Sequence, residues 1–154
     1  MIEFNNVKKL VDEVIKENST LFLIDLQIAS DNKITIIVDG DNGIAIKECI
    51  RISRYIESNL DREKTDFSLE VTSPGATEPL VNKRQYQKNI GRILKVKTET
   101  DTIEGILTNA NENEINLEWK VREPKPIGKG KVTVVKKATL SYENIKQAKV
   151  KIIF

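Results

Sequence analysis

Two carboxylates in the segment Asp39-Gly40-Asp41-Asn42-Gly43 are the first residues in the chain that could do chemistry. Acidic residues spaced by two resemble the start of a calcium-binding loop. Such a loop needs glycine at its sixth position and a bidentate carboxylate at its twelfth, where this chain has Ile44 and Ile50. The segment therefore predicts a turn that leads into a helix, and no metal site.

A hydrolase that used Asp39 and Asp41 would lack the rest of its machinery. The chain has no histidine and a single cysteine, Cys49, so the usual zinc ligand sets and an internal disulfide are excluded. It also lacks a Gly-x-Ser-x-Gly motif and a lysine-bearing glycine loop that could cradle a phosphate. We predict that Cys49 is a small buried residue, that the protein is not an enzyme and that it needs no cofactor.

The strongest pattern for binding is a basic segment that spans residues 120–131. Five basic side chains stand there against one acidic side chain, Glu123, in a region with proline and glycine, and Lys136 and Lys137 follow. Lysine and arginine at a flexible rim can neutralise phosphates without choosing a base sequence. A solvated loop that only keeps the protein soluble is the alternative. The predicted RNA-binding residues are Lys120, Arg122, Lys125, Lys129 and Lys131, with Lys83, Arg84 and Lys88 upstream.

Aromatic side chains on which bases could stack are few. The candidates are Tyr86, Trp119 and Tyr142, and residues of these types more often belong to a core or its rim. The composition therefore favours contact with the RNA backbone over readout of the bases.

Charge is divided unequally along the 154 residues. Residues 1–82 carry 9 positive and 15 negative side chains, net −6, whereas residues 83–154 carry 16 and 8, net +8. This asymmetry predicts two domains, 1–82 and 83–154, of which the basic one faces an anionic polymer. Ordinary variation of surface charge is the alternative. No apolar run is long enough to span a bilayer or form a signal-peptide core, so we expect a cytoplasmic protein with no membrane partner.

The first half reads as an αββαβ domain. Apolar residues recur at helical spacing over 4–15, and β-rich segments at 21–29 and 34–38 flank a turn, which predicts a helix and an antiparallel hairpin. A strand at 67–72 ends the domain. The helix between them is expected to turn a stripe of residues inward, namely Ile46, Cys49, Ile50, Ser53, Ile56 and Leu60.

The second half reads as a connector helix at 80–89 followed by strands. Five short β-rich segments are separated by turn residues, at 93–98, 102–108, 114–121, 132–140 and 148–154. Such spacing predicts a small SH3-like or Sm-like barrel, which closes its own edges. The expected fold class is therefore α+β, with an αββαβ domain followed by a small β-barrel.

Several of these segments together resemble the ribosome maturation factor RimP family. The most specific is Leu69-Glu70-Val71-Thr72-Ser73-Pro74-Gly75 with Pro79-Leu80 shortly after it, and Glu104-Gly105-Ile106-Leu107 is similar to the family's barrel. The family usually follows Ser-Pro-Gly with Leu-Asp-Arg, where this chain has Ala76-Thr77-Glu78. The resemblance implies an assembly factor that binds precursors of the small (30S) subunit through rRNA and a basic ribosomal protein near the decoding centre.

The resemblance also implies structural roles for Glu70, Ser73, Pro74, Gly75, Pro79 and Gly105. Glu70 either faces solvent or anchors the following turn by a hydrogen bond, while Pro74 and Gly75 set backbone geometry. A free-standing Sm-like RNA-binding regulator is the other functional interpretation. Such a regulator would need only the barrel, so the acidic half favours a second, protein-directed surface in a monomeric assembly factor.

Overall fold

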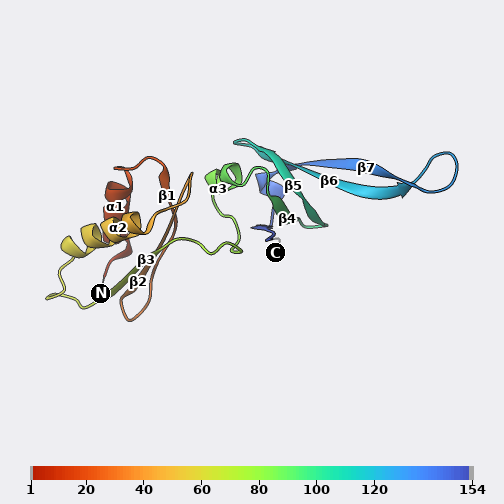
Figure 1. Ribbon diagram of the computed structural model, residues 1–154. Coiled ribbons are helices and arrows are strands. Elements are labelled where there is room, and N and C mark those ends of the chain that lie inside the picture. The colour runs from red at the N-terminus through yellow and green to blue at the C-terminus, as the bar shows by residue number, and fades with distance from the viewer. Residues whose placement is uncertain (1, 153–154) are drawn as a thin grey trace. The chain divides into compact units, whose positions relative to one another are not determined.

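The computed structural model describes residues 2–152 and divides between Gly75 and Ala76 into two compact units, the N-terminal unit and the C-terminal unit. Figure 1 labels helices α1–α3 and strands β1–β7. The division precedes residue 82, where the charge pattern places the boundary, so the connector helix belongs to the C-terminal unit. Among residues 2–152, no helix is long and apolar enough to cross a bilayer.

The N-terminal unit has the predicted order of helices and strands. Strands β1 and β2 pair as an antiparallel hairpin, and β3 pairs with β2 in parallel. Parallel neighbours need a crossover connection, which here contains a helix. The two helices pack against one another and against the sheet, and their shared core is centred on Val11, Ile34 and Ile52. The elements are α1 (Phe4–Ile15), β1 (Leu21–Ile28), β2 (Lys33–Gly40), α2 (Ile46–Ser58) and β3 (Ser68–Thr72).

Helix α2 turns only part of the predicted stripe to the core: Ile56 is buried as predicted and Leu60 packs against the core, but Ile52, which the pattern leaves out, replaces Ile46 and Ile50. Ile46 and Ile50 are 79% and 45% exposed, whereas Ile52 and Ile56 are fully buried. At about 100° per residue, Ile46 lies roughly 100° and Ile50 roughly 140° around the helix from the middle of the face that Ile52 and Ile56 define, so both point away from the core. Cys49 is half-buried, and burial together with the neighbouring Glu48 carboxylate raises the pKa of its thiol, which disfavours a nucleophilic role.

The C-terminal unit is built around one antiparallel sheet with the strand order β7-β6-β5-β4-β8. In the described part of the chain β7 and β8 stand at opposite ends of this order, so the sheet is open and a closed barrel is not confirmed. The last strand ends at Val150, and residues 153–154 of the predicted strand lie outside the described residues. The elements are α3 (Lys83–Lys88), β4 (Ile93–Lys97), β5 (Thr102–Ala110), β6 (Glu114–Pro124), β7 (Lys131–Ser141), η1 (Tyr142–Asn144) and β8 (Gln147–Val150).

One face of this sheet carries the core of the C-terminal unit. Alternate strand residues are buried there, and Tyr86 of α3 covers them with its ring edge-on to Tyr142, 5.1 Å between centroids. Helix α3 begins with a capping box, in which the Asn82 side chain accepts from Arg84 N and the Gln85 side chain accepts from Asn82 N. The buried strand residues include Leu94, Val96, Leu107, Ile115, Leu117 and Ala148.

The buried phenol of Tyr86 makes the stability of the C-terminal unit sensitive to alkaline pH. Burial raises its pKa to about 12, with a smaller contribution from Tyr142. The unfolded chain loses this proton near pH 10. Stabilisation is therefore complete below about pH 10 and is lost as pH rises through about 12. We expect Tyr86→Phe to lose less stability over this window, as measured by thermal melts at a series of pH values. Equal losses in both proteins would contradict this assignment.

Candidate nucleic-acid interface

Strands β6 and β7 form a long hairpin that projects beyond the rest of the C-terminal sheet (Figure 1). Strand β5 pairs with β6 only as far as Glu118, so the hairpin beyond that point consists of two strands. Its ladder runs from Lys120 opposite Val135 to Pro124 opposite Lys131. We call residues 120–135 the arm. Because none of these residues is buried, the arm contributes little to the core.

The sequence predicts a flexible basic loop over 120–131, but much of this segment is strand. Strand β6 continues to Pro124 and β7 begins at Lys131, so the connecting loop contains only residues 125–130. Lys125 N donates to Gly130 O at 3.1 Å across the loop, where Gly130 has φ 98°. Proline and charged residues obscured the strand, but Pro124 is tolerated at a strand end and the pairing continues up to it.

Strand alternation sorts the basic residues of the arm by face. Lys120, Arg122 and Lys131 share one face, because successive strand residues point to opposite sides and Lys131 lies opposite Pro124. The Arg122 guanidinium donates to Thr133 Oγ1 at 3.0 Å. Glu123 lies on the other face, where its carboxylate pairs with Lys136 Nζ at 3.0 Å.

Positive charge on the arm is therefore left uncompensated. Within residues 2–152, Lys120, Lys125, Lys129 and Lys131 make no ion pair, and the one acidic side chain of the arm already pairs with Lys136. All four lysines are exposed. Such ammonium groups can neutralise phosphates and release their counterions, which gives affinity that falls with salt concentration.

The predicted residues of α3 are not brought to the arm. Lys83 Nζ donates to Glu112 O at 2.6 Å and lies 5.2 Å from the centroid of the Tyr142 ring. Glu112 belongs to the turn before β6, whereas the loop of the arm follows the far end of that strand. Arg84 is half-buried and Lys88 is exposed. Lys83 thus has a local structural role, and α3 stays a separate candidate contact.

The aromatic residues serve packing. Trp119 lies against Gly105, because a Cβ atom on Gly105 would stand 3.2 Å from Trp119 Cε3 and 3.0 Å from Glu118 O. Tyr86 is buried, and Tyr142 Oη donates to Asn111 O at 2.7 Å. Close contact with Trp119 and Glu118 thus explains glycine at position 105. The contacts of the three rings favour a packing role over base stacking.

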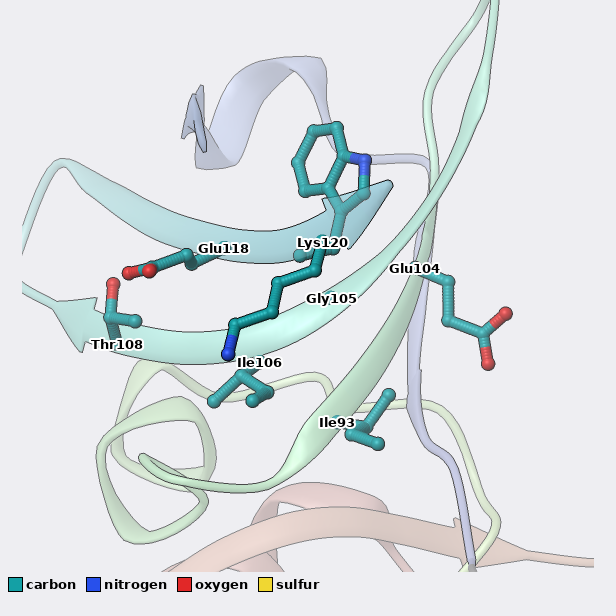
Figure 2. Close-up of a pocket in the computed structure, with 8 residues that line it drawn as sticks. Ile93, Glu104, Gly105, Ile106, Thr108, Glu118 and Lys120 are labelled. Atoms are coloured by element: carbon teal, nitrogen blue, oxygen red, sulfur yellow. The ribbon is translucent and has the colours of Figure 1, made fainter. Parts of the chain in front are cut away.

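A shallow groove of about 600 Å³ lies at the base of the arm, on the face of the sheet opposite the core. Figure 2 shows the Lys120 side chain extending across Gly105 toward Ile106. Ile106 is 45% exposed and lies directly opposite Ile93 of β4. The lining residues are Ile93, Glu104, Gly105, Ile106, Thr108, Glu118, Trp119 and Lys120.

Five family-motif residues lie close to the division between the units in the chain, Glu70, Ser73, Pro74 and Gly75 before it and Pro79 after it. Glu70 is exposed, and its carboxylate makes no hydrogen bond to another described residue. Ser73 and Gly75 are exposed, while Pro74 and Pro79 are half-buried. Their expected role in shaping the chain between the units stays a prediction.

The acidic turn at the end of β2 is held by hydrogen bonds among its own residues. Asp39 is buried, and its Oδ1 accepts a hydrogen bond from Gly40 N at 2.8 Å. Gly43 N donates to Gly40 O at 2.9 Å and closes the turn. Across residues 2–152, no group of three or more histidine, cysteine or acidic side chains could hold a metal ion.

Comparisons with known proteins extend over both units. The family model of the RimP N-terminal domain matches residues 10–77. The ribosome maturation factor RimP of Christiangramia forsetii is 60% identical over 148 residues, which cover 96% of this chain and 97% of the relative. That of Flavobacterium psychrophilum is 53% identical over 96% of each chain, and that of Porphyromonas gingivalis is 36% identical over 96% of this chain and 97% of the relative.

Proposed function

Because this chain belongs to the RimP family of ribosome maturation factors, we propose that it is a non-enzymatic assembly factor for the small (30S) ribosomal subunit. It binds precursor subunits as a cytoplasmic monomer, through rRNA and through a basic small-subunit ribosomal protein near the decoding centre. No cofactor takes part. In this proposal the open sheet of the C-terminal unit is a variant of the SH3-like or Sm-like barrel.

The arm is the observation that carries the rRNA part of the proposal. Its exposed two-stranded ladder holds basic side chains away from the core, and its one carboxylate is paired with Lys136. Contacts of this kind position a protein on phosphates without reading a sequence. Packing of the three candidate aromatic rings supports the same choice of backbone over bases.

The N-terminal unit supports a different partner. Its 75 residues carry 9 basic and 14 acidic side chains, net −5, so it would repel RNA and attract a basic protein. Complementary charge speeds association and suppresses wrong partners more than it adds affinity. The acidic unit would thus set partner choice, while the C-terminal unit supplies the RNA contact.

Purification of ribosomal particles with the tagged chain tests the proposed function. We expect the wild-type chain to enrich precursor small subunits over mature ones, as measured by the ratio of unprocessed to mature rRNA in the eluate. The variant Lys125→Glu, Lys129→Glu should lose most of this enrichment because it reverses the charge at the loop of the arm. Lys64→Glu, an exposed residue of the N-terminal unit, is the control. Equal recovery of precursor and mature subunits by the wild-type chain would contradict the proposal.

A further inference from the structure

Strand register gathers distant lysines on the face of the C-terminal sheet opposite its core. Leu94, Val96 and Ala148 point into the core, so their strand neighbours point away from it. We call this opposite side the outer face. It includes the groove at the base of the arm and joins one face of the arm through β6. Its exposed basic residues are Lys95, Lys97, Lys120, Arg122, Lys131, Lys137 and Lys149.

Two of these lysines face each other directly. Lys95 of β4 is the cross-strand partner of Lys149 of β8. Like charges placed directly opposite in an antiparallel pair destabilise the sheet. In the part of the chain that is described, neither ammonium group makes an ion pair or a hydrogen bond to a side chain. Glu104 stands opposite Lys95 on β5 but pairs with Lys151, so an external anion that lies between β4 and β8 would further relieve the repulsion.

Three carboxylates, Glu104, Glu114 and Glu118, interrupt the outer face without cancelling its charge. Glu104 Oε1 pairs with Lys151 Nζ at 2.5 Å, so it is already neutralised. Glu118 lines the groove beside Thr108. The seven basic residues thus exceed the three acidic ones. They lie on β8 and β4 on one side of β5 and on β6 and β7 on the other, and the Lys120 side chain extends across Gly105 of β5 between the two groups.

We propose that the outer face is a second RNA-binding surface, which takes the phosphate backbone of double-helical RNA and is continuous with the arm. The inference rests on the proposed function and extends it to residues of β4 and β8. A helix is the form of RNA that fits, because single strands are held by stacking on aromatic rings. The one aromatic residue that lines the groove, Trp119, already packs against Gly105, and Tyr86 and Tyr142 pack on each other. Lysines on a sheet face suit phosphate oxygens, which a helical backbone presents on its outside.

Lys149→Glu tests this surface with two measurements that move in different directions. The substitution turns the Lys95–Lys149 pair into a pair of opposite charges, so the melting temperature should stay equal or rise. Binding of the full chain to a fluorescein-labelled RNA hairpin should weaken several-fold. The slope of log affinity against log salt should become shallower by roughly one phosphate contact, about 0.9. Lys64→Glu makes the same change of charge in the N-terminal unit and should leave both values near wild type.

RNA affinity of Lys149→Glu that equals that of Lys64→Glu would overturn the proposal. So would a melting temperature several degrees below wild type, because the repulsion would then not exist. Tighter binding to a single strand of the same length than to the hairpin would overturn the choice of a helix. If Lys149→Glu binds RNA normally while the wild-type chain still enriches precursor subunits, the outer face fails and the proposed function stands.

Discussion

Replacing Gly40 with alanine is expected to destabilise the N-terminal unit strongly while the C-terminal unit keeps its stability. A Cβ atom at Gly40 would lie 2.2 Å from Gly43 O and 3.1 Å from Leu21 Cδ2. The first of these atoms is backbone, and Gly43 N also donates to Gly40 O, so the turn cannot open without losing its own hydrogen bond. We expect a loss of about 3 kcal/mol in the free energy of unfolding, as for an overpacked site.

Gly43→Ala is the matched control in the same turn. Gly43 has φ +83°, which favours glycine, but a Cβ atom there meets nothing within 4 Å. Backbone strain of this kind costs about 1 kcal/mol. The residue with the unusual φ should thus be the more tolerant of the two, because a steric clash with backbone outweighs a strained dihedral angle.

Thermal melts monitored by NMR or by limited proteolysis would report the stability of each unit separately. For a domain of this size about 3 kcal/mol corresponds to a fall of about 15 °C in the melting temperature. The fall should be confined to Ile2–Gly75, with resonances of the C-terminal unit unchanged. A joint loss of both units in one transition would contradict the separable domains that the charge pattern predicts. Equal melting of the two glycine variants would contradict the steric argument.

The order of helices and strands was predictable because each element carries its own periodicity. Val7, Val11 and Val14 mark one helical stripe, and Ile34, Ile36 and Val38 mark one face of a strand. The periodicity of apolar residues predicts the buried face poorly where more than one face of a helix is apolar. In α2 the apolar residues run almost around the helix, so the pattern identified Ile56, but only tertiary packing selects Ile52 over Ile46 and Ile50.

The candidate site was predictable only in part, because its charges come from distant strands. The basic arm is one continuous segment, so composition alone reveals Lys125 and Lys129. Lys95 and Lys149 are separated by more than fifty residues and look like ordinary solvated charges until the β4–β8 register places them opposite one another. A tight turn such as Gly40–Gly43 is equally hidden, since sequence shows the glycines but not the distance that makes one of them indispensable.

Shortening the arm should remove most of the RNA affinity and leave the fold intact. Residues 121–134 can be replaced by Asn-Gly, because Lys120 and Val135 lie directly opposite and such a dipeptide closes a two-residue hairpin. No residue of the excised segment is buried, so the C-terminal unit should keep its thermal stability within a few degrees. The loss of Glu123 also breaks its pair with Lys136, an exposed ion pair of the kind that contributes little.

The excised segment contains four basic residues and one acidic residue, so its removal tests the charge of the arm directly. If each basic residue meets one phosphate, the slope of log affinity against log salt should become shallower by about 3.6. Affinity for the RNA hairpin at physiological salt should fall on the order of 100-fold. Fluorescence anisotropy over a salt series measures both quantities.

A variant with a full-length but uncharged arm distinguishes an electrostatic role of the arm from a role of its shape. In this control Arg122, Lys125, Lys129 and Lys131 are replaced by glutamine, which keeps the strands and the Glu123–Lys136 pair. If phosphate contact is the role of the arm, the neutral arm should bind as weakly as the shortened chain, with the same shallow salt slope. A neutral arm that binds like wild type would mean that the arm acts by shape. Wild-type affinity in the shortened chain would instead show that the arm does not contact the RNA. If Lys149→Glu then binds more weakly than the shortened chain, the outer face is the surface that holds the RNA.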